Sequence, residues 1–455
     1  MNYLEDRVLK SKYPLGVSAI GSLLLTLVVF YITWWIFQHP EGILRLYTPF
    51  VGYMYARWWL VVLIWIGYVM LFWPFSKKWL DDTHPLIKGT VLTAFSAAVV
   101  LFVVFIIFDL FFGHLGIRYF SAEKLEQIPK VTGFFAEEYA STAIMMVAVT
   151  ASWLAPAWVV SFGRSPWQDV KQPYQGFSIL FVTFSLSLII FFVTMHPHMA
   201  ILYVPWQTFT ATLPPYWENF ANTVSGNFHV AWIMCCSVTI WIYETIWERY
   251  PFGMIKNKAV RFFSTFFGIV VIAWSMNLFF YFLQDIVWGE AIRGTRRLYA
   301  PDWRWLHVGE IAVFLLVPAL FIKFYLNNWP NKYSLGVRVL VRTLLTVAGA
   351  IFVYVMYYKY AHYVLGTQAG YSHPQQFPMI AMIWLINIWI VHNWFMDNWP
   401  FWTKAKPNTE EAVVEIETAD GISFGGILLG AVISIVVVVV AVWIYQNIGI
   451  AVKLV

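Results

Sequence analysis

The chain has 455 residues, of which 60% are hydrophobic and only 12% are charged, and its formal net charge is +5. A water-soluble domain of this length is excluded, because folding could not hide so much apolar surface from water. The sequence also holds no phosphate-binding loop, dinucleotide-binding fingerprint or nucleophile elbow, and nothing in it points to nucleic acid. Composition therefore predicts an all-α integral membrane protein in a lipid bilayer.

Eleven apolar runs follow one another along the chain, separated by charged or proline-rich breaks. Each reaches the length of about 20 residues that a helix needs to cross the hydrocarbon core of a bilayer. We expect about 11 transmembrane helices, near residues 15–39, 48–75, 87–114, 138–164, 173–197, 222–249, 259–288, 306–327, 335–363, 376–399 and 422–447.

A polar stretch, residues 404–421, separates the last run from the others. We therefore divide the chain into a ten-span membrane body (1–403), a cytoplasmic linker (404–421) and a single C-terminal transmembrane helix (422–455). The first run is too long for the apolar core of a signal peptide, so we expect it to stay as the first span.

The runs alternate between two kinds. Five of the six odd-numbered runs begin on a glycine: Gly16, Gly89, Gly176, Gly336 and Gly421. Even-numbered runs end on an aromatic-proline pattern, at residues 72–75, 165–167, 250–252, 328–331 and 398–401. The spacing of about 80 residues predicts a tandem repeat of a two-helix unit. The alternative is that helical hairpins in general place prolines and aromatic residues at the membrane interface.

Lysine and arginine are distributed unevenly between the two sides of the predicted bundle. The side of the N-terminus carries most of them, including Lys77, Lys78, Lys256 and Lys258. By the positive-inside rule this side faces the cytoplasm. We therefore expect a multi-pass protein of the inner (cytoplasmic) membrane, with its N-terminus in the cytoplasm and, because the number of spans is odd, its C-terminus outside.

Eight of the ten histidines fall on the outer face of this predicted bundle. Neutral imidazole binds copper, zinc and haem iron, and a neighbouring carboxylate can orient the ring. We predict a transition-metal site, with copper as one candidate, from His196, His198, His229, His307 and Glu310. Three further histidines are candidates for cofactor binding: His39, His114 and His362. Haem fits these positions less well, because they lie near span ends. The alternative is that histidine, being amphipathic, favours the membrane interface.

Five ionisable residues lie inside the apolar runs: Arg57, Asp109, Glu244, Lys323 and Lys359. Ionisable groups at membrane depth are costly and often functional. Most of these are within two turns of a span end, however, so they could instead extend their charged groups to the interface.

Two segments are candidates for contacts with partners. The last run contains GxxxG spacings, including Gly426 and Gly430, which permit close helix packing against other membrane subunits. Arg293, Arg296 and Arg297 make an outer loop basic, and an acidic periplasmic partner could dock there. The alternatives are a peripheral helix facing lipid and an anchor for lipid headgroups.

Three functions are compatible with these features. The first is a membrane subunit of a redox or metal-dependent complex whose site lies near the outer face, which the one-sided histidines favour. The second is a secondary transporter of a small solute, a class that often contains internal repeats. The third is a structural anchor for partner subunits. The sequence leaves open whether the chain is an enzyme.

Overall fold

The computed structural model describes residues 3–48, 50–114, 118–128, 131, 133–195, 226–287, 301–367 and 378–405. Within these ranges nine helices are long and apolar enough to cross a membrane, which confirms an all-α multi-pass membrane protein. The expected last span, most of the linker before it and Arg293, Arg296, Arg297, Gly426 and Gly430 lie outside the described residues.

Five helices form a closed inner ring. They are α3 (Val51–Ile64) with its continuation η1 (Trp65–Val69), α7 (Phe134–Val160), α12 (Gly226–Thr245), α15 (Pro301–Tyr325), and α17 (Pro378–Ile390) with η6 (Val391–Phe395). Each packs against the next in this order, and α17 packs back against α3. These are the even-numbered predicted spans.

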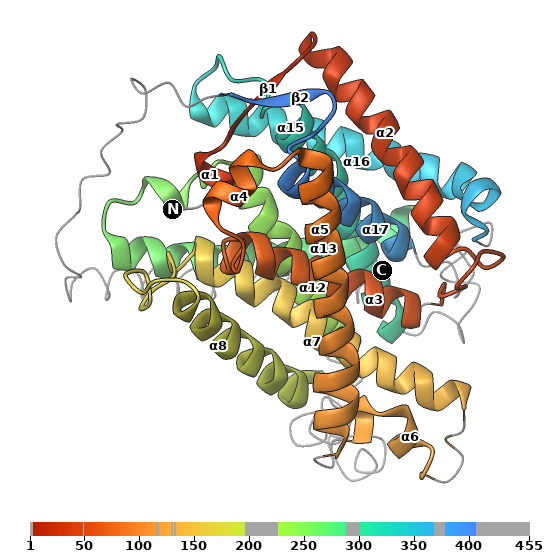
Figure 1. Cartoon of the computed structure of the whole chain (residues 1–455). Helices are drawn as coiled ribbons and strands as arrows, with labels where there is room; N and C mark the ends of the chain where they lie inside the picture. Colours follow the sequence, from red (N-terminus) through yellow and green to blue (C-terminus); the bar gives the residue numbers. More distant parts are fainter. Residues whose placement is uncertain are drawn as a thin grey trace.

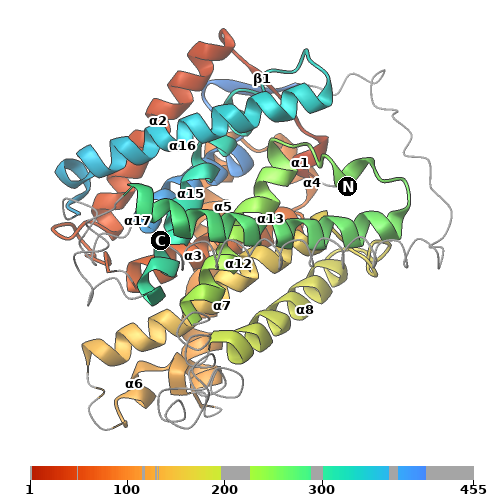
Figure 2. The same ribbon diagram turned by 180° about the vertical axis from the view of Figure 1, so that it is seen from behind.

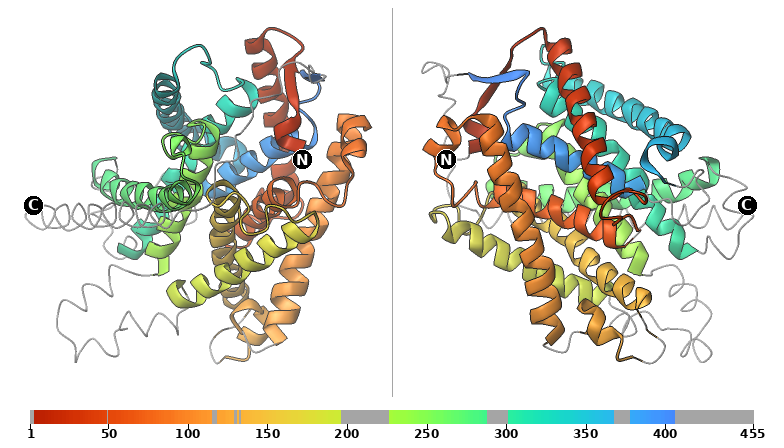
Figure 3. Two further views of the ribbon diagram at one scale, coloured as in Figure 1. Left: turned by 90° about the vertical axis from the view of Figure 1, so that its left-hand side faces the viewer. Right: turned by 45° about the vertical axis from the view of Figure 1, so that its right-hand side comes forward.

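Five outer helices surround this ring. They are α2 (Leu15–Phe37), α5 (Pro85–Leu101) with η2 (Phe102–Phe112), α8 (Tyr174–Ile190) with η4 (Phe191–Met195), α13 (Lys258–Val287) and α16 (Leu335–Leu365). Figure 1 has α5 in front, Figure 2 has α13 in front, and Figure 3 shows the orange α5 along the outside from two further sides. In the most apolar window of each outer helix 17–33% of the residues are buried, against 72–94% for α7, α12, α15 and α17.

The outer helices turn their small polar side chains inward and their large apolar ones outward. On α2 the buried positions include Ser18, Ser22 and Thr26, one turn apart, whereas Ile20 and Leu24 are exposed. This arrangement is the reverse of a helix on a soluble protein. It follows from the bilayer, where small residues allow close packing and lipid accepts the apolar face.

Tryptophans of the inner ring use these hydroxyl groups as acceptors. The indole nitrogen donates to a threonine or serine of an outer helix in four cases: Trp389 to Thr26, Trp384 to Thr33 and Trp59 to Ser96 at 3.0 Å, and Trp247 to Thr343 at 2.9 Å. Each bond satisfies a buried donor that has no water to bond with. These four tryptophans thus contribute to the contact between the two layers.

The five ring helices end in the same way, on the side of the bundle where the outer helices begin (the N-terminal side). Each end has two successive residues with positive φ, followed by a third residue and a cis proline. The second of these residues donates its backbone N–H to a carbonyl six residues earlier, at 2.8–3.3 Å: Phe72 to Ile66, Arg164 to Trp158, Arg249 to Tyr243, Asn328 to Ile322 and Asn398 to His392. The bond resembles that of a Schellman cap but spans one residue more, as expected where two residues in place of one have positive φ.

Side chains from one ring-helix end cap the preceding one. Asn328 Nδ2 donates to the carbonyl of Thr245 at 3.2 Å, and Asn398 Nδ2 donates to that of Phe324 at 2.8 Å. Arg164 Nη2 likewise donates to the carbonyl of Tyr68 at 2.5 Å. All three carbonyls belong to the last turn of a helix, where backbone acceptors have no partner within the helix.

The N-terminal segment lies across this end of the ring. It contains α1 (Tyr3–Asp6) and β1 (Val8–Ser11), and β1 pairs antiparallel with β2 (Trp402–Ala405), so that Val8 faces Ala405 and Ser11 faces Trp402. Four further short elements lie between the long helices in the described ranges: α4 (Lys77–Asp82), η3 (Arg118–Phe120), α6 (Ala122–Leu125) and η5 (Phe252–Met254). The first and last described segments are therefore held together.

Arg342 fastens α16 to the ends of two ring helices, so its removal should destabilise the fold. The buried guanidinium binds Glu248 at 2.5 Å and also donates to the carbonyl groups of Ile246, Asn328 and Pro330. We expect Arg342→Met to cost about 3–5 kcal/mol, because it leaves a partly buried carboxylate and several carbonyls unmatched. The measurement is the thermal unfolding midpoint in detergent.

Arg338→Met is the matched control. Arg338 lies on the same helix and binds the same carboxylate, but its side chain is 25% exposed. We expect this variant to lose no more than about 1 kcal/mol. If the two variants lost the same unfolding free energy, the buried hydrogen bonds of Arg342 would contribute no more to stability than the exposed pair of Arg338.

Candidate functional site

A cavity of about 620 Å³ lies at the N-terminal side of the ring. Its walls come from η1, α12, α15 and η6 and from the turn that follows α15, and the N-terminal segment covers part of it. Two of these elements, η1 and η6, are π-helical turns, which recur at functional sites in membrane and soluble proteins. The volume is in the range of cavities that hold small molecules.

Three aromatic side chains from different ring helices form one wall. Tyr68 lies with its ring centre 5.4 Å from that of Trp241 and 6.2 Å from that of Trp394, and the two tryptophan rings are 6.1 Å apart. Such faces pack against the apolar or planar part of a bound molecule. The cavity thus offers an apolar surface among polar groups.

Glu244 is a carboxylate of the cavity whose charge is already matched. Tyr68 donates its hydroxyl to Oε1 at 2.5 Å, and Arg249 binds both oxygens at 2.7 and 2.8 Å. These three bonds hold Glu244 in one orientation. Through its bond to Tyr68, the Glu244 carboxylate fixes the position of one ring of the aromatic wall.

Lys323 lines the same cavity from α15. Among the residues that the structure describes, its ammonium group has neither a hydrogen bond nor an ion pair. Four asparagines, Asn327, Asn328, Asn331 and Asn393, share the wall with it. The carboxylates of Glu244 and Glu248 attract the ammonium group of Lys323 from beyond ion-pair distance.

Arg57 lies deeper in the ring and is almost fully buried, with 2% of its surface exposed. Its Nη2 donates to Ser152 Oγ at 2.7 Å, and Ser152 Oγ lies 3.1 Å from Ser237 Oγ. Ser237 is one helical turn, about 6 Å, from Trp241 on α12. Arg57 itself is eleven residues, about 16 Å along the helix axis, from Tyr68. The polar groups of α3, α7 and α12 are therefore not among the residues that line the cavity.

Arg57 has no carboxylate partner within 4 Å in the described ranges, and its Nε is buried without a hydrogen bond. A buried charge without a counter-charge is costly in any protein and more so at membrane depth. The sequence singled out Arg57, Glu244 and Lys323 as ionisable groups inside apolar runs. Glu244 and Lys323 line the cavity, and Arg57 is buried elsewhere in the ring. Asp109 and Lys359 lie exposed on outer helices.

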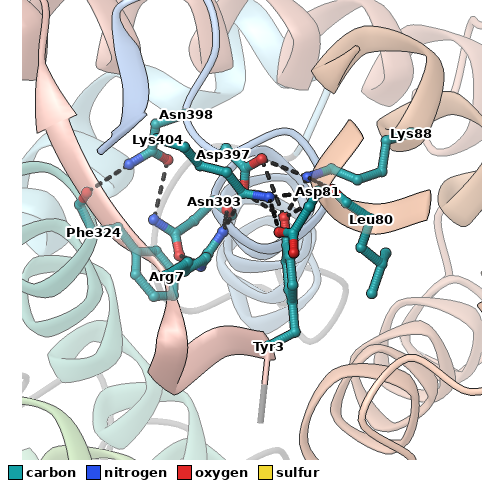
Figure 4. Close-up of polar contacts among 10 residues, drawn as sticks. All are labelled: Tyr3, Arg7, Leu80, Asp81, Lys88, Phe324, Asn393, Asp397, Asn398 and Lys404. Carbon is teal, nitrogen blue, oxygen red and sulfur yellow. Dashed lines mark hydrogen bonds and ion pairs between the residues drawn. The ribbon is translucent and has the colours of Figure 1, made fainter. Parts of the chain in front are cut away.

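A buried cluster holds the N-terminal segment over the cavity (Figure 4). Asp397, at the end of the last ring helix, binds Arg7 at 2.8 Å and also pairs with Lys88 of α5. Tyr3 donates its hydroxyl to Asp397 at 3.2 Å and accepts a bond from Lys88 at 2.6 Å. Arg7 extends the cluster by donating to the side chain of Asn393 at 2.6 Å.

The protonation state of the Tyr3 phenol favours this arrangement. Burial, together with the neighbouring Asp397 carboxylate, raises the pKa of Tyr3. The phenol therefore stays protonated at neutral pH and keeps its donor for Asp397. Sequence reasoning missed this cluster, because Tyr3 and Asp397 are 394 positions apart.

The structure describes some of the predicted histidines. His307 Nδ1 lies 2.7 Å from Glu310 Oε2, and the two form a buried pair on α15. His229 is half-buried on α12, which packs directly against α15. His196 and His198 lie outside the described residues.

The three histidines predicted to bind a cofactor are on different outer helices or their ends. His39 is buried, His362 is half-buried beside Tyr363, and His114 is exposed. No group of three or more histidine, cysteine, aspartate or glutamate side chains in the described part of the chain could hold a metal ion. The metal and cofactor assignments stay predictions.

Comparison with known protein families, with curated proteins and with solved structures finds no match to this chain.

Asp397→Asn should loosen the N-terminal segment, because the change leaves Arg7 and Lys88 without their shared carboxylate. We expect a cysteine introduced at the cavity wall, Leu9→Cys, to react at least about tenfold faster with a membrane-impermeant maleimide in this background, which corresponds to ~1.4 kcal/mol. The rate of labelling of purified protein in liposomes gives the measurement.

Asp81→Asn serves as the control for this experiment. Asp81 pairs with Lys404 at 2.6 Å nearby, but its side chain is 42% exposed. Labelling of Leu9→Cys should change little in that background. An unchanged rate in folded Asp397→Asn would contradict a fastening role for Asp397.

Proposed function

We propose that this chain is a membrane transport protein that binds a small polar solute in the cavity and passes it along the axis of the ring. The observation that carries the proposal is the position of the cavity, with its aromatic wall and its charged and amide groups, at one end of a closed ring of helices. Arg57, Ser152 and Ser237 form a second polar group deeper in the same ring, at a depth where ionisable side chains are often functional.

The orientation of the cavity is part of the proposal. The lysines and arginines on the N-terminal side favour the cytoplasm by the positive-inside rule. The cavity then faces the cytoplasm, and the protein resides in the inner membrane with its N-terminus inside. With the run at 422–447 as an eleventh span, the C-terminus is outside.

We also propose that the body is a tandem repeat of five two-helix units of about 80 residues. The support is the shared backbone geometry at the five ring-helix ends and the capping of one end by the next. Unrelated helical hairpins also place prolines and aromatic residues at the membrane interface. They are not expected to share a hydrogen bond from a backbone N–H to the carbonyl six residues earlier at every helix end. Each unit returns the chain to the same side, so the copies are parallel.

A transport assay tests the proposed function. Purified full-length protein in proteoliposomes is supplied with radiolabelled amino acids, carboxylates, sugars and inorganic anions, and uptake is compared with that of protein-free liposomes. We expect saturable uptake of at least one class. Absence of uptake across the panel, with protein shown to be folded and inserted, would contradict the proposal.

Trp394→Leu should weaken this uptake, because it removes one face of the aromatic wall. We expect KM to rise about tenfold, equivalent to ~1.4 kcal/mol of binding free energy. Phe181→Leu is the control, since Phe181 is 74% exposed on outer helix α8. A KM unchanged in Trp394→Leu would place solute binding elsewhere.

A metal-dependent subunit is the second candidate, and one observation favours it. The buried contact between His307 and Glu310 is the arrangement that orients metal-binding imidazoles. Elemental analysis of protein purified without chelators should then find copper or another transition metal. The double variant His196→Ala with His198→Ala should lose the metal, and the His84→Ala control should retain it. Metal-free native protein would contradict this candidate.

A further inference from the structure

Two opposite charges are exposed on the outer layer of helices. Asp109 lies near the end of η2, which continues α5, and Lys359 lies near the end of α16. Neither side chain has a hydrogen bond or an ion pair with another described residue. Beyond the first turn of each outer helix, these two are the exposed charged side chains among the residues whose exposure the structure describes.

Apolar side chains that face away from the ring surround each of the two charges. Ile106, three residues before Asp109, is 45% exposed, and Met356, three residues before Lys359, is 42% exposed. A charge on a surface that faces lipid is costly to keep without a counter-charge. A group of opposite charge at the same depth would therefore stabilise either face.

The two charges lie at similar distances from the N-terminal side of the bundle. Lys88 ties α5 to the end of η6, and Asp109 follows it by 21 residues. Arg342 ties α16 to the end of α15, and Lys359 follows it by 17 residues. The two distances along the helices are about 32 and about 26 Å at 1.5 Å per residue. The wider turns of η2 rise less per residue and bring the two values closer.

The two helices lie on different parts of the ring within one copy. α5 packs on α3 and η6, whereas α16 packs on α15 and α2. In Figure 1 the outer end of the orange α5 is well apart from that of the cyan α16. Asp109 and Lys359 therefore do not meet in one chain. Two copies that are inserted in the same direction, however, present them at similar depths.

We propose that copies of this chain associate in the membrane through a contact between the η2 face of one copy and the α16 face of the next, in which Asp109 of one copy pairs with Lys359 of the other. This single contact supplies both missing counter-charges. Because the two faces differ, each copy binds one neighbour through each face, and the copies form a ring or a row. The contact does not depend on the proposed transport function.

Cross-linking between two cysteine variants tests this contact. Ile106→Cys and Met356→Cys are each three residues from a charge and leave both charges in place, and the native Cys235 and Cys236 are fully buried. The two full-length variants are mixed in liposomes and treated with a short bifunctional thiol reagent. We expect a cross-linked dimer from the mixture and little from either variant alone.

Val193→Cys takes the place of Ile106→Cys in the control mixture. Val193 is 46% exposed on η4, which belongs to a third outer helix. An equal dimer yield in this control, or no dimer in the test mixture at any ratio of lipid to protein, would overturn the proposal. A different protein cross-linked to Met356→Cys in native membranes, in place of a second copy, would also overturn it.

Charge variants identify the pair. Asp109→Lys added to Ile106→Cys should lower the dimer yield about fivefold, because it places two positive charges opposite each other. Lys359→Asp added to the Met356→Cys copy should then restore the yield, which a general loss of folding would not allow. An unchanged yield with Asp109→Lys, or no recovery when both charges are reversed, would overturn the assignment of this pair.

Discussion

In hydrocarbon the last carbonyl groups of a helix have no water to bond with, and each ring helix must therefore end where another group can reach them. The five ring helices meet this requirement with one backbone geometry. Each ends in two successive residues with positive φ, and the second donates its backbone N–H to the carbonyl group six residues earlier. Residues such as Asn328 and Asn398 then cap the helix before them. The ends are thus tied to one another around the ring, and the cavity forms where they meet.

The division into an inner ring and an outer layer of helices also follows from the hydrocarbon environment. Large aliphatic side chains on the outer helices face lipid, and their serines and threonines face inward, where ring tryptophans donate to them. The inner helices are covered by the outer ones, so they can carry polar and charged side chains that would be costly to expose to lipid. Arg57 and the serines beside it are of this kind, as are the charged and amide groups around the cavity.

The sequence predicted most of the architecture. Runs of apolar residues gave the ranges of α2 and α8 within a few residues, because membrane length and hydrophobicity are local properties. Charges inside apolar runs marked Arg57, Glu244 and Lys323 for the same reason. The ends of the even-numbered spans differed more from expectation, because the aromatic-proline patterns belong to the left-handed turns rather than to the helices.

Composition and hydropathy by themselves determined that the chain crosses a membrane many times and which charges lie within its apolar runs, because both are local properties of the sequence. Only the tertiary structure decided the order of the helices in the ring and the contact of Tyr3 and Arg7 with Asp397. Charge matching is a property of distance in space. Two residues at opposite ends of the chain can meet within hydrogen-bond reach, and no pattern along the sequence records it.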